Sequence, residues 1–416
     1  MSDLNDIPNG WVETILGEVV ERITKGTTPK NFSDDKDDIN YIKSDALQYG
    51  GFLDSSRFVK ITGEVNDKLK RSKLKKDDIL LSMAGEKLGK TGLVTKEHLP
   101  ANTNQAVAII TVNKEIVNYK FIWYKLRNKN TVKYFKSIPS QSAQPNINFQ
   151  EIRSLPINLP PLQEQKAIAN ILSAFDDKIE NLQAQNETLE QTAQTIFKEW
   201  FGKHQIGDEL PDGWRVGKMG EIARLKSGYA FKSKDFIETS NFKALKIKDL
   251  KGNGNVSVSD VSSIDENCTK IERVQYFRLK EGDIVLAMSG NTTGKIGVIP
   301  PHSNEIYLNQ RVGKFFLKDE NQKSFLYNFL MSGNFEEKIL SMGYGSAQPN
   351  ISPSQIENID IFFPDDDKQK EYLKISNPIY DKVLMNNSQI QSLKKTRDTL
   401  LPKLMSGQLR INDYKV

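Results

Sequence analysis

The chain consists of two copies of one sequence unit, and this duplication constrains its fold more than any other feature. Residues 75–94 and 280–299 align without a gap and are identical at nine of twenty positions. The hexapeptide Ser-Ala-Gln-Pro-Asn-Ile occurs at 142–147 and again at 346–351. An offset of 204 in a chain of 416 residues leaves little outside the two copies. This period is far longer than the ~20–50 residues of solenoid repeats. We therefore expect a duplicated domain with pseudo-two-fold symmetry.

Each copy has a mixed part followed by a long helix. Short β-prone runs such as 78–83 and 106–110 are separated by glycines, which is typical of strands joined by tight turns. Prolines before each helical stretch and Gly202 and Gly407 after them fit helix ends, whereas Pro402 should break or kink the last turn. The sequence predicts an α+β fold with two tandem mixed α/β domains and two long helices. The expected boundaries are 1–160, 161–204, 205–364 and 365–416.

The two long helices carry matching apolar seams. Apolar residues follow steps of three and four, which define a heptad pattern. The first seam is Ile168, Leu172, Phe175, Ile179, Leu182, Asn186, Leu189, Ala193, Ile196 and Trp200. The second is Tyr372, Ser376, Ile379, Val383, Asn386, Ile390, Leu393, Arg397, Leu400 and Leu404.

An antiparallel alignment of these seams places Ile168 opposite Leu404 and Asn186 opposite Asn386. An amide pair in an apolar seam specifies register, because any slip leaves buried amides unpaired. We therefore predict an intramolecular antiparallel coiled coil about 60 Å long. Ser376, Arg397 and Pro402 predict looser packing at parts of the second seam. The alternative is two unrelated amphipathic helices, each packed on its own domain.

Composition excludes several classes of protein. The single cysteine, Cys268, rules out a disulfide framework and favours a cytoplasmic protein. The N-terminal residues lack the apolar core of a signal peptide, and no apolar run reaches the ~18 residues that span a membrane. The three histidines are scattered without ligand spacing, so we expect no metal and no cofactor. A net charge of +5 is a weak argument for nucleic-acid binding.

Three motifs that resemble catalytic sequences fail on inspection. Residues 84–91 resemble a phosphate-binding loop, but a strand-like run follows where that loop requires a helix. Residues 377–380, Asn-Pro-Ile-Tyr, resemble an adenine-methyltransferase motif but lie within the second long helix. Glu164 and Lys166 resemble part of a nuclease motif, but the second copy has Lys368 in place of Glu164. The position of Glu164 at the start of a helix favours a role in helix capping and a favourable interaction with the helix dipole.

Basic residues and divergent loops favour DNA. Six Lys and Arg residues lie within residues 68–76, and such blocks attract phosphates, although a solvated surface is an equal alternative for any one lysine. The copies agree at the motifs above but differ over 27–70 and 229–275. A shared scaffold with divergent loops is expected of two domains that recognise different DNA sequences. The alternative is that these surface loops diverged without functional consequence.

These features together resemble the specificity (S) subunit of type I restriction-modification systems over nearly the whole chain. The resemblance rests on the Gly-Trp pairs at 10 and 213, the hairpins 78–92 and 283–297, the hexapeptides and the sequence Leu-Pro-Pro-Leu-Gln-Glu-Gln at 159–165. It implies two target recognition domains that each read half of a bipartite site in double-stranded DNA. It also implies that the long helices set the spacing and dock two methyltransferase (M) subunits, which recruit restriction (R) subunits. The S subunit itself would have no catalytic activity.

We expect readout by polar side chains on the divergent loops and phosphate contacts elsewhere. The expected DNA-binding residues are Thr27, Thr28, Lys30, Lys43, Lys68, Lys70, Arg71, Lys73, Lys90, Tyr229, Lys232, Lys246, Lys248, Arg273 and Lys295. Alternatives are a P-loop nucleotide hydrolase, a stand-alone DNA methyltransferase, or a scaffold that binds only proteins.

Overall fold

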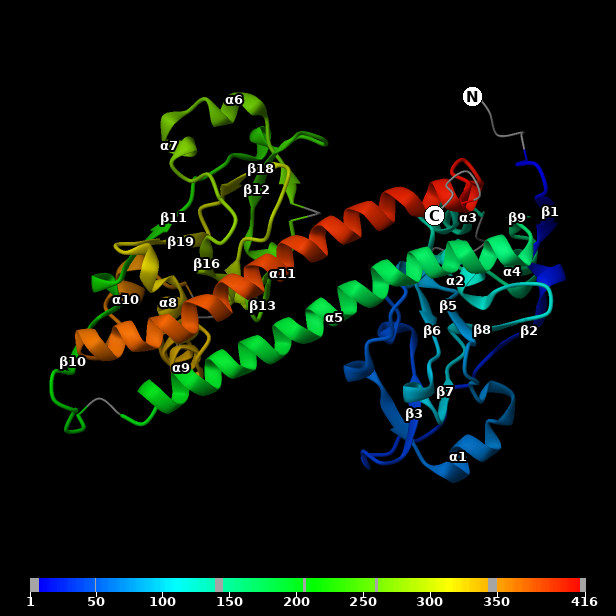
Figure 1. Ribbon diagram of the computed structural model, residues 1–416, viewed down its shortest axis with the longest axis horizontal. Coiled ribbons are helices and arrows are strands. Elements are labelled where there is room, and N and C mark those ends of the chain that lie inside the picture. Colours follow the sequence, from blue (N-terminus) through cyan, green and yellow to red (C-terminus); the bar gives the residue numbers. More distant parts are fainter. Residues whose placement is uncertain are drawn as a thin grey trace. The chain divides into compact units, whose positions relative to one another are not determined.

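The computed structural model describes residues 7–48, 50–138, 145–204, 207–258, 261–342 and 350–411 (Figure 1). Contacts divide the chain into two compact units. Unit 1 contains residues 1–177 and 394–416, and unit 2 contains residues 178–393. Each unit therefore combines one mixed copy with a segment of both long helices. The first three residues of one hexapeptide and the first four of the other lie outside the described residues.

Unit 1 contains three small sheets. An antiparallel four-stranded sheet has the order β2 (Val20–Lys25), β8 (Val107–Val112), β5 (Ile79–Ser82) and β6 (Thr91–Leu93). A three-stranded sheet has the order β4 (Val59–Ile61), β3 (Ile39–Ile42) and β7 (Ala101–Thr103), in which β3 and β7 are parallel. The third sheet pairs β1 (Val12–Ile15) with β9 (Pro156–Leu159), so the two ends of the mixed copy meet.

Unit 2 repeats these strand orders. Its four-stranded sheet contains β11 (Ala223–Ser227), β19 (Val312–Leu317), β16 (Ile284–Ala287) and β17 (Ile296–Val298). Its three-stranded sheet contains β15 (Ser262–Ser263), β12 (Phe242–Leu245) and β18 (Glu305–Leu308), and β10 (Arg215–Lys218) pairs with β20 (Asp360–Phe363). A hairpin of β13 (Leu250–Gly252) and β14 (Asn255–Val256) has no counterpart among the strands described in unit 1. The duplication predicted from sequence is therefore a duplication of topology.

Short helices complete each unit. Those of unit 1 are α1 (Gly63–Lys68), α2 (Tyr119–Arg127), α3 (Lys129–Ser137) and α4 (Phe149–Arg153). Those of unit 2 are α6 (Glu266–Thr269), α7 (Glu272–Gln275), α8 (Lys323–Leu330), α9 (Gly333–Met342) and α10 (Pro353–Glu357).

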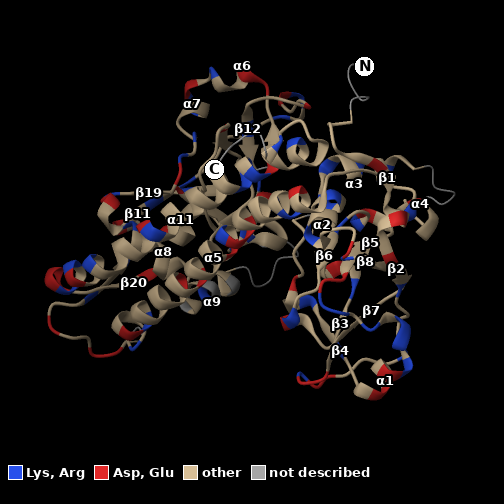
Figure 2. Ribbon diagram, turned by 45° about the vertical axis from the view of Figure 1, so that its right-hand side comes forward, with Lys and Arg blue, Asp and Glu red and all other residues tan. Residues whose placement is uncertain are grey.

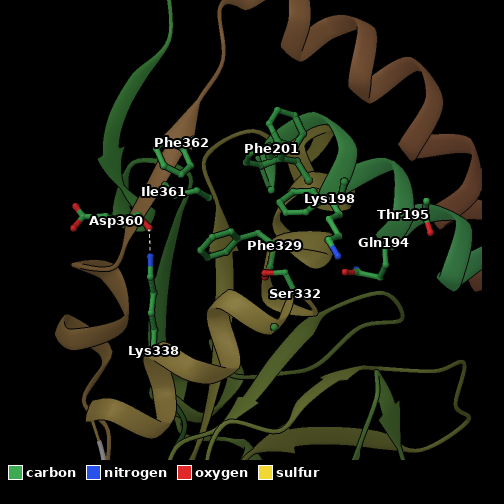
Figure 3. A pocket seen from close by; sticks show the side chains of 14 residues that line it. Gln194, Thr195, Lys198, Phe201, Phe329, Ser332, Lys338, Asp360, Ile361 and Phe362 are labelled. Carbon is green, nitrogen blue, oxygen red and sulfur yellow. Dashed lines mark hydrogen bonds between the residues drawn. The ribbon is translucent and has the colours of Figure 1, made fainter. Parts of the chain in front are cut away.

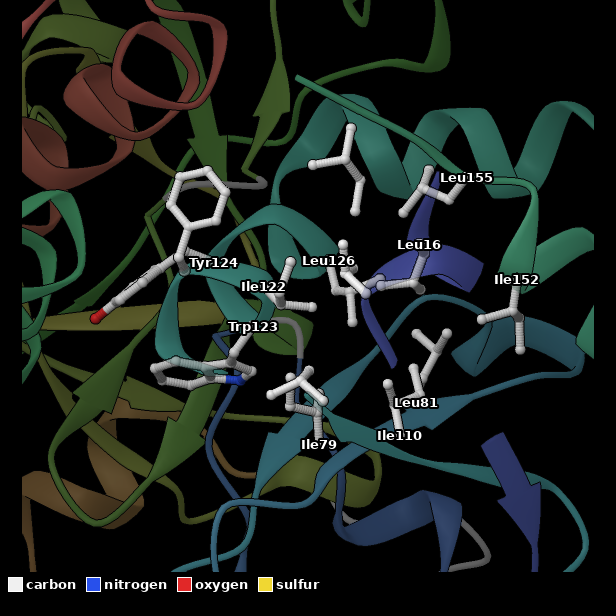
Figure 4. Close-up of a cluster of buried hydrophobic side chains, with 14 of the residues drawn as sticks. Leu16, Ile79, Leu81, Ile110, Ile122, Trp123, Tyr124, Leu126, Ile152 and Leu155 are labelled. Atoms are coloured by element: carbon white, nitrogen blue, oxygen red, sulfur yellow. The ribbon is translucent and has the colours of Figure 1, made fainter. Parts of the chain in front are cut away.

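Strand β5 connects two cores of unit 1. All four of its residues are buried, and side chains alternate between the faces of a strand. Ile79 and Leu81 pack with α2 and Ile168 in the cluster drawn in Figure 4, while Leu80 packs into a separate cluster. A strand that is buried on both faces has a continuous run of apolar residues. The apolar run at 78–83 therefore predicted this strand from the sequence.

The long helices are α5 (Leu162–Phe201) and α11 (Asp366–Ser406). In unit 1, Ile168 and Leu404 lie in one buried cluster. In unit 2, Leu182 packs with Ile390, and the rings of Trp200 and Tyr372 lie 5.8 Å apart. Within each unit the helices therefore pair antiparallel, and the predicted fold class is confirmed.

The central asparagines of the seam are in contact within unit 2. Asn386 Nδ2 donates a hydrogen bond to Asn186 Oδ1 at 2.8 Å, and Asn186 Nδ2 donates to Asn387 Oδ1 at 2.8 Å. Asn186 and Asn386 are both buried. The sequence did not indicate Asn387, which lies one position beyond the seam.

We predict that these asparagines fix the register as a coupled set. Asn186→Leu alone should lower the free energy of unfolding by about 1–3 kcal/mol, because it leaves the buried Asn386 amide without its partner. Asn186→Leu with Asn386→Leu should cost less than the sum of the two single changes, which urea unfolding of the four proteins in this cycle would measure. Additive costs would show that the two amides act independently.

The break expected in α11 was wrong. The helix continues through Pro402 to Ser406 without a break. Two polar residues of its seam have partners: Ser376 Oγ lies 2.7 Å from Ser324 Oγ, and Arg397 Nη1 lies 2.6 Å from Asp176 Oδ1. The seam tolerates these polar residues because residues outside the heptad pattern form hydrogen bonds or ion pairs with them. A cavity of about 640 Å³ adjoins Arg397 and Pro402, so looser packing at that end of the helix stays a prediction.

Candidate nucleic-acid interface

The residues shared by the two copies build turns. The backbone N–H of Lys75 donates to Asp78 Oδ2 at 2.8 Å, and that of Lys280 donates to Asp283 Oδ2 at 2.7 Å. Each aspartate thereby closes the turn before a central strand. Burial raises the pKa of Asp78, while a hydrogen bond from Thr111 opposes that shift. Repetition of these aspartates therefore marks the scaffold rather than a reactive site.

The glycine-rich segment after β5 is a hairpin. A short 3-10 turn at Gly85–Lys87 leads directly to strand β6, so no helix N-terminus is available to hold phosphates. The backbone N–H of Ile147 donates to the Met83 carbonyl at 2.9 Å, and Ile351 donates to Met288 in the same way. The described ends of the hexapeptides thus pair with the hairpins, which explains why both motifs are shared. This geometry does not favour the nucleotide-hydrolase alternative.

The divergent loop 27–30 is anchored on the Asn104-Gln105 pair. Thr27 and Thr28 are exposed, and Thr28 Oγ1 donates to Gln105 Oε1. A Cβ at Gly26 would collide with the carbonyl of Thr103, so this close approach requires glycine.

Unit 2 anchors its own loop in the same way. The Tyr229 N–H donates to the Leu308 carbonyl at 2.8 Å, and Gln310 N–H donates to the Tyr229 carbonyl at 3.0 Å. Gly228 approaches the Leu308 carbonyl too closely for a Cβ. In each unit a shared pair therefore presents a divergent loop, which begins Thr-Thr in one and Tyr-Ala in the other.

The hairpin lysines lie in different surroundings. Lys90 is half-buried, and burial lowers the pKa of its ammonium, with Lys87 and Arg57 adding to the shift and Glu86 opposing it. Lys295 is exposed and, with Lys251, lines a cavity of about 390 Å³. The hairpin thus contributes a cation to a basic surface in each unit.

Lys43 and Lys246 hold equivalent positions before a short turn. Lys43 Nζ lies 5.4 Å from the Phe32 ring centroid, and Lys246 Nζ lies 3.6 Å from that of Phe236. Burial lowers the pKa of Lys246. Cation–π contact restrains both lysines within the divergent regions.

The basic block at residues 68–76 is partly neutralised. Lys68 pairs with Glu64 at 2.6 Å, and Lys73 pairs with Asp67 at 2.6 Å. Figure 2 shows both signs of charge together on α1. The other expected contacts are exposed on the surfaces of their units: Lys30, Lys70, Arg71, Lys232, Lys248 and Arg273. The block and Lys90 lie on different elements of unit 1.

Sequence reasoning missed three cations. Arg57 and Lys87 lie near Lys90, and Lys251 lies near Lys295. Arg57 and Lys251 occupy segments that differ between the copies, so only the fold places them beside the hairpin. Its place in the turn between two predicted strands could have indicated Lys87.

Glu164 lies in the first turn of α5, as the expected role in the helix dipole requires, and it also makes tertiary hydrogen bonds. It is buried and accepts hydrogen bonds from Trp11 Nε1 at 3.1 Å and from Arg410 Nε at 2.8 Å. Its function is to connect the shared tryptophan, the start of α5 and the C-terminal segment within unit 1. Spacing along the chain could not reveal a contact over 246 residues.

A pocket in unit 2 has no catalytic arrangement among its described lining residues. It measures about 400 Å³ and lies between the end of α5, α8, α9 and β20 (Figure 3). Lys338 Nζ donates to the Asp360 carbonyl at 2.9 Å, and the Asp360 carboxylate pairs with Lys218 at 2.6 Å. Phenylalanines occupy much of the remaining wall. Lys338 and Asp360 are therefore engaged in holding the fold.

Two searches of the described residues gave negative results. They contain no group of three or more His, Cys, Asp or Glu side chains that could hold a metal ion. None of the described helices has the length and apolar character required to cross a bilayer.

A family model and individual relatives of this chain indicate the same protein family. The family model for the type I restriction modification DNA specificity domain matches twice, over residues 8–191 and 211–395. The MjaVIII specificity subunit of Methanocaldococcus jannaschii, a type I restriction enzyme component, is 29% identical over 98% of this chain and 95% of its own length. The HindI specificity subunit of Haemophilus influenzae is 25% identical over 81% of this chain and 87% of its own length.

A solved structure supports the fold. The S subunit of a type I restriction-modification system from M. genitalium superposes with a TM-score of 0.58 at 19% identity, covering 97% of this chain and 98% of that one. The two family matches agree with the two copies found in the sequence and in the strand orders. The chain therefore belongs to the type I restriction-modification DNA specificity family.

Proposed function

We propose that this chain is the DNA-recognition subunit of a type I restriction-modification complex and has no catalytic activity of its own. The observation that carries the proposal is the pair of family matches, one on each structural repeat. The topology supports it, because equivalent scaffolds present the different loops that begin at Thr27 and Tyr229. Each unit would read one half of a bipartite site in double-stranded DNA.

The proposed mechanism separates readout from positioning. Polar side chains of the divergent loops contact base edges, while Lys90, Lys295 and the 68–76 block hold phosphates. The paired helices fix the gap between half-sites and dock two methyltransferase subunits, through which restriction subunits join. Domain boundaries near 160, 204 and 364 would then separate recognition domains from spacer helices.

Methylation mapping tests this function directly. The chain is expressed with the methyltransferase encoded beside it in a host that lacks both, and modified bases are mapped across the genome. We expect a split motif with two short half-sites around an unspecified gap. Absence of new methylation from a complex that forms and binds S-adenosylmethionine would contradict the proposal. A methyltransferase that gives the same motif without this chain would also contradict it.

Lys90→Gln should weaken DNA binding without changing sequence preference. One lost phosphate contact lowers the slope of log K against log salt by about 1 and weakens binding to specific and random duplexes alike. Salt titrations of both duplexes by fluorescence anisotropy measure the two effects, with Lys90→Arg as the charge-conserving control. Loss of preference with unchanged affinity for random DNA would assign Lys90 to base readout instead.

A further inference from the structure

The β13–β14 hairpin of unit 2 has a short polar tip. Its strands pair at Gly252 and Asn255, so the chain reverses over the two residues between them. Gly252, Asn253 and Gly254 have positive φ, at 87°, 49° and 73°, a conformation that glycine and asparagine tolerate. Asn253 and Asn255 are exposed. The tip therefore presents two amide side chains from a tight turn.

The hairpin rests on strand β17 at a glycine that both copies share. A Cβ at Gly297 would collide with Val256 Cγ2, and the Val298 N–H donates to the Gly254 carbonyl at 2.8 Å. The tip also rests on α8, because a Cβ at Gly254 would collide with Tyr327 Oη. Strand β17 and helix α8 thus hold the tip in place before any ligand binds, which lowers the entropic cost of binding.

The equivalent glycine of unit 1 supports a different segment. A Cβ at Gly92 would collide with Leu53, which forms a bridge with Leu47. Residues 47–53 contain no asparagine, whereas the tip in unit 2 contains two. Gly92 and Gly297 therefore mark the same platform in each unit, and the chain that crosses it differs. Such a place suits the recognition of different half-sites.

A second exposed amide lines the same cavity as the tip. The cavity measures about 390 Å³, and both Asn253 and Asn291 belong to its wall. Asn291 lies in the turn of the shared hairpin, at the position where unit 1 has Glu86. A carboxamide can donate and accept hydrogen bonds at once. The fold therefore brings together two groups able to read a base edge, from two places where the copies differ.

We propose that the β13–β14 hairpin enters the major groove of the half-site that unit 2 reads, where the Asn253 carboxamide contacts an adenine. The inference rests on the proposed function and names a residue that reads one base. The major groove is about 12 Å wide and admits a two-stranded ribbon. An asparagine amide accepts from adenine N6 and donates to N7. Asn291 supplies a second amide beside it for a neighbouring base.

The first test replaces Asn253 by aspartate in the complex with the methyltransferase. Aspartate has nearly the same shape and tolerates positive φ, so the turn should be retained. A carboxylate cannot donate to adenine N7, but it accepts from cytosine N4. We therefore expect one adenine position of the motif to shift its preference toward cytosine. The shift should fall in the half-site that exchange of residues 205–364 alters, and methylation mapping measures it.

Asn253→Gly separates the side chain from the turn. Glycine adopts the φ of 49° without strain, so only the carboxamide is lost. We expect the same position to accept any base and the parent site to bind about tenfold to hundredfold more weakly. Binding to random duplexes should stay the same in fluorescence anisotropy. Lys295→Gln, at the same cavity, is the contrasting control and should weaken both duplexes alike.

The outcomes separate the hairpin from the general function. If the parent complex methylates a split motif and both Asn253 variants keep that motif and its affinity, Asn253 serves only the turn and the proposed function stands. Equal weakening of specific and random binding by Asn253→Gly would make Asn253 a backbone contact and overturn the base assignment. A change at a base other than adenine would overturn the adenine contact. A parent complex without a split motif overturns both proposals.

Discussion

Asp176→Ala is expected to lower the free energy of unfolding of unit 1 by about 3–5 kcal/mol, because it leaves the buried Arg127 without a counter-charge and Arg397 with only the more exposed Asp398. The Asp176 carboxylate accepts hydrogen bonds from Tyr124 Oη, Arg127 Nη1 and Arg397 Nη1, at 2.7, 2.7 and 2.6 Å. The side chains of Asp176 and both arginines are at most 8% exposed. Residues from α2, α5 and α11 therefore meet on one charge.

Urea unfolding of the purified chain measures this effect, with Asp177→Ala as the matched control. Asp177 is the exposed neighbour on the same helix, so its loss should change stability by less than about 0.5 kcal/mol. A cost below about 1 kcal/mol for Asp176→Ala would show that water reaches the arginines and compensates them.

A second variant separates burial of charge from the pairing itself. Replacing Asp176, Arg127 and Arg397 together by leucine and methionine should restore much of the lost stability, because apolar groups of similar volume often replace buried ion pairs without cost.

Exchange of residues 1–160 for the same segment of a family member with a different motif should change one half of the methylated site completely. The other half should stay as it is, and the reciprocal exchange of residues 205–364 should change only that half. The physical reason is that the divergent loops of each mixed copy are held on contacts internal to its own unit. Methylation mapping of the two chimaeras and the parent measures the result.

The structure restricts the donors for this exchange. β1 pairs with β9, so both strands must come from the same donor. Trp11 donates to Glu164, and the Asn118 N–H donates to Gln165 Oε1 at 2.9 Å, across the proposed junction. A donor that has tryptophan at position 11 and any residue except proline at position 118 keeps both bonds and avoids an artefact of misfolding. If a well-folded chimaera changes both half-sites, recognition is not divided between the copies.

The sequence predicted those parts of the fold that depend on repetition and periodicity. Identical residues in the two copies indicated duplicated domains, and the heptad pattern indicated paired helices, including the contact between Asn186 and Asn386. These signals persist in sequence because they follow chain order or helical geometry. The break expected at Pro402 was wrong because tertiary packing outweighed a local preference against proline.

Features that depend on contacts distant in sequence could not be predicted in this way. The link between Asp176 and Arg397 joins residues 221 apart, and Arg57 reaches the vicinity of Lys90 only through folding. The seam pattern marked Arg397 as a defect, although it completes a buried ion pair.

Unit 1 is formed by two separate stretches of the chain, and this determines which unit can fold first during synthesis. Its core includes Leu401, Leu404 and Met405, and Arg410 bonds to Glu164, so the unit needs residues near both ends of the described chain. Unit 2 is continuous from residue 178 to 393. On the ribosome, the second half of the chain can therefore complete its core before the first half can. Until then, the α5 face around Ile168 stays uncovered by α11, and a chaperone would find an apolar surface there.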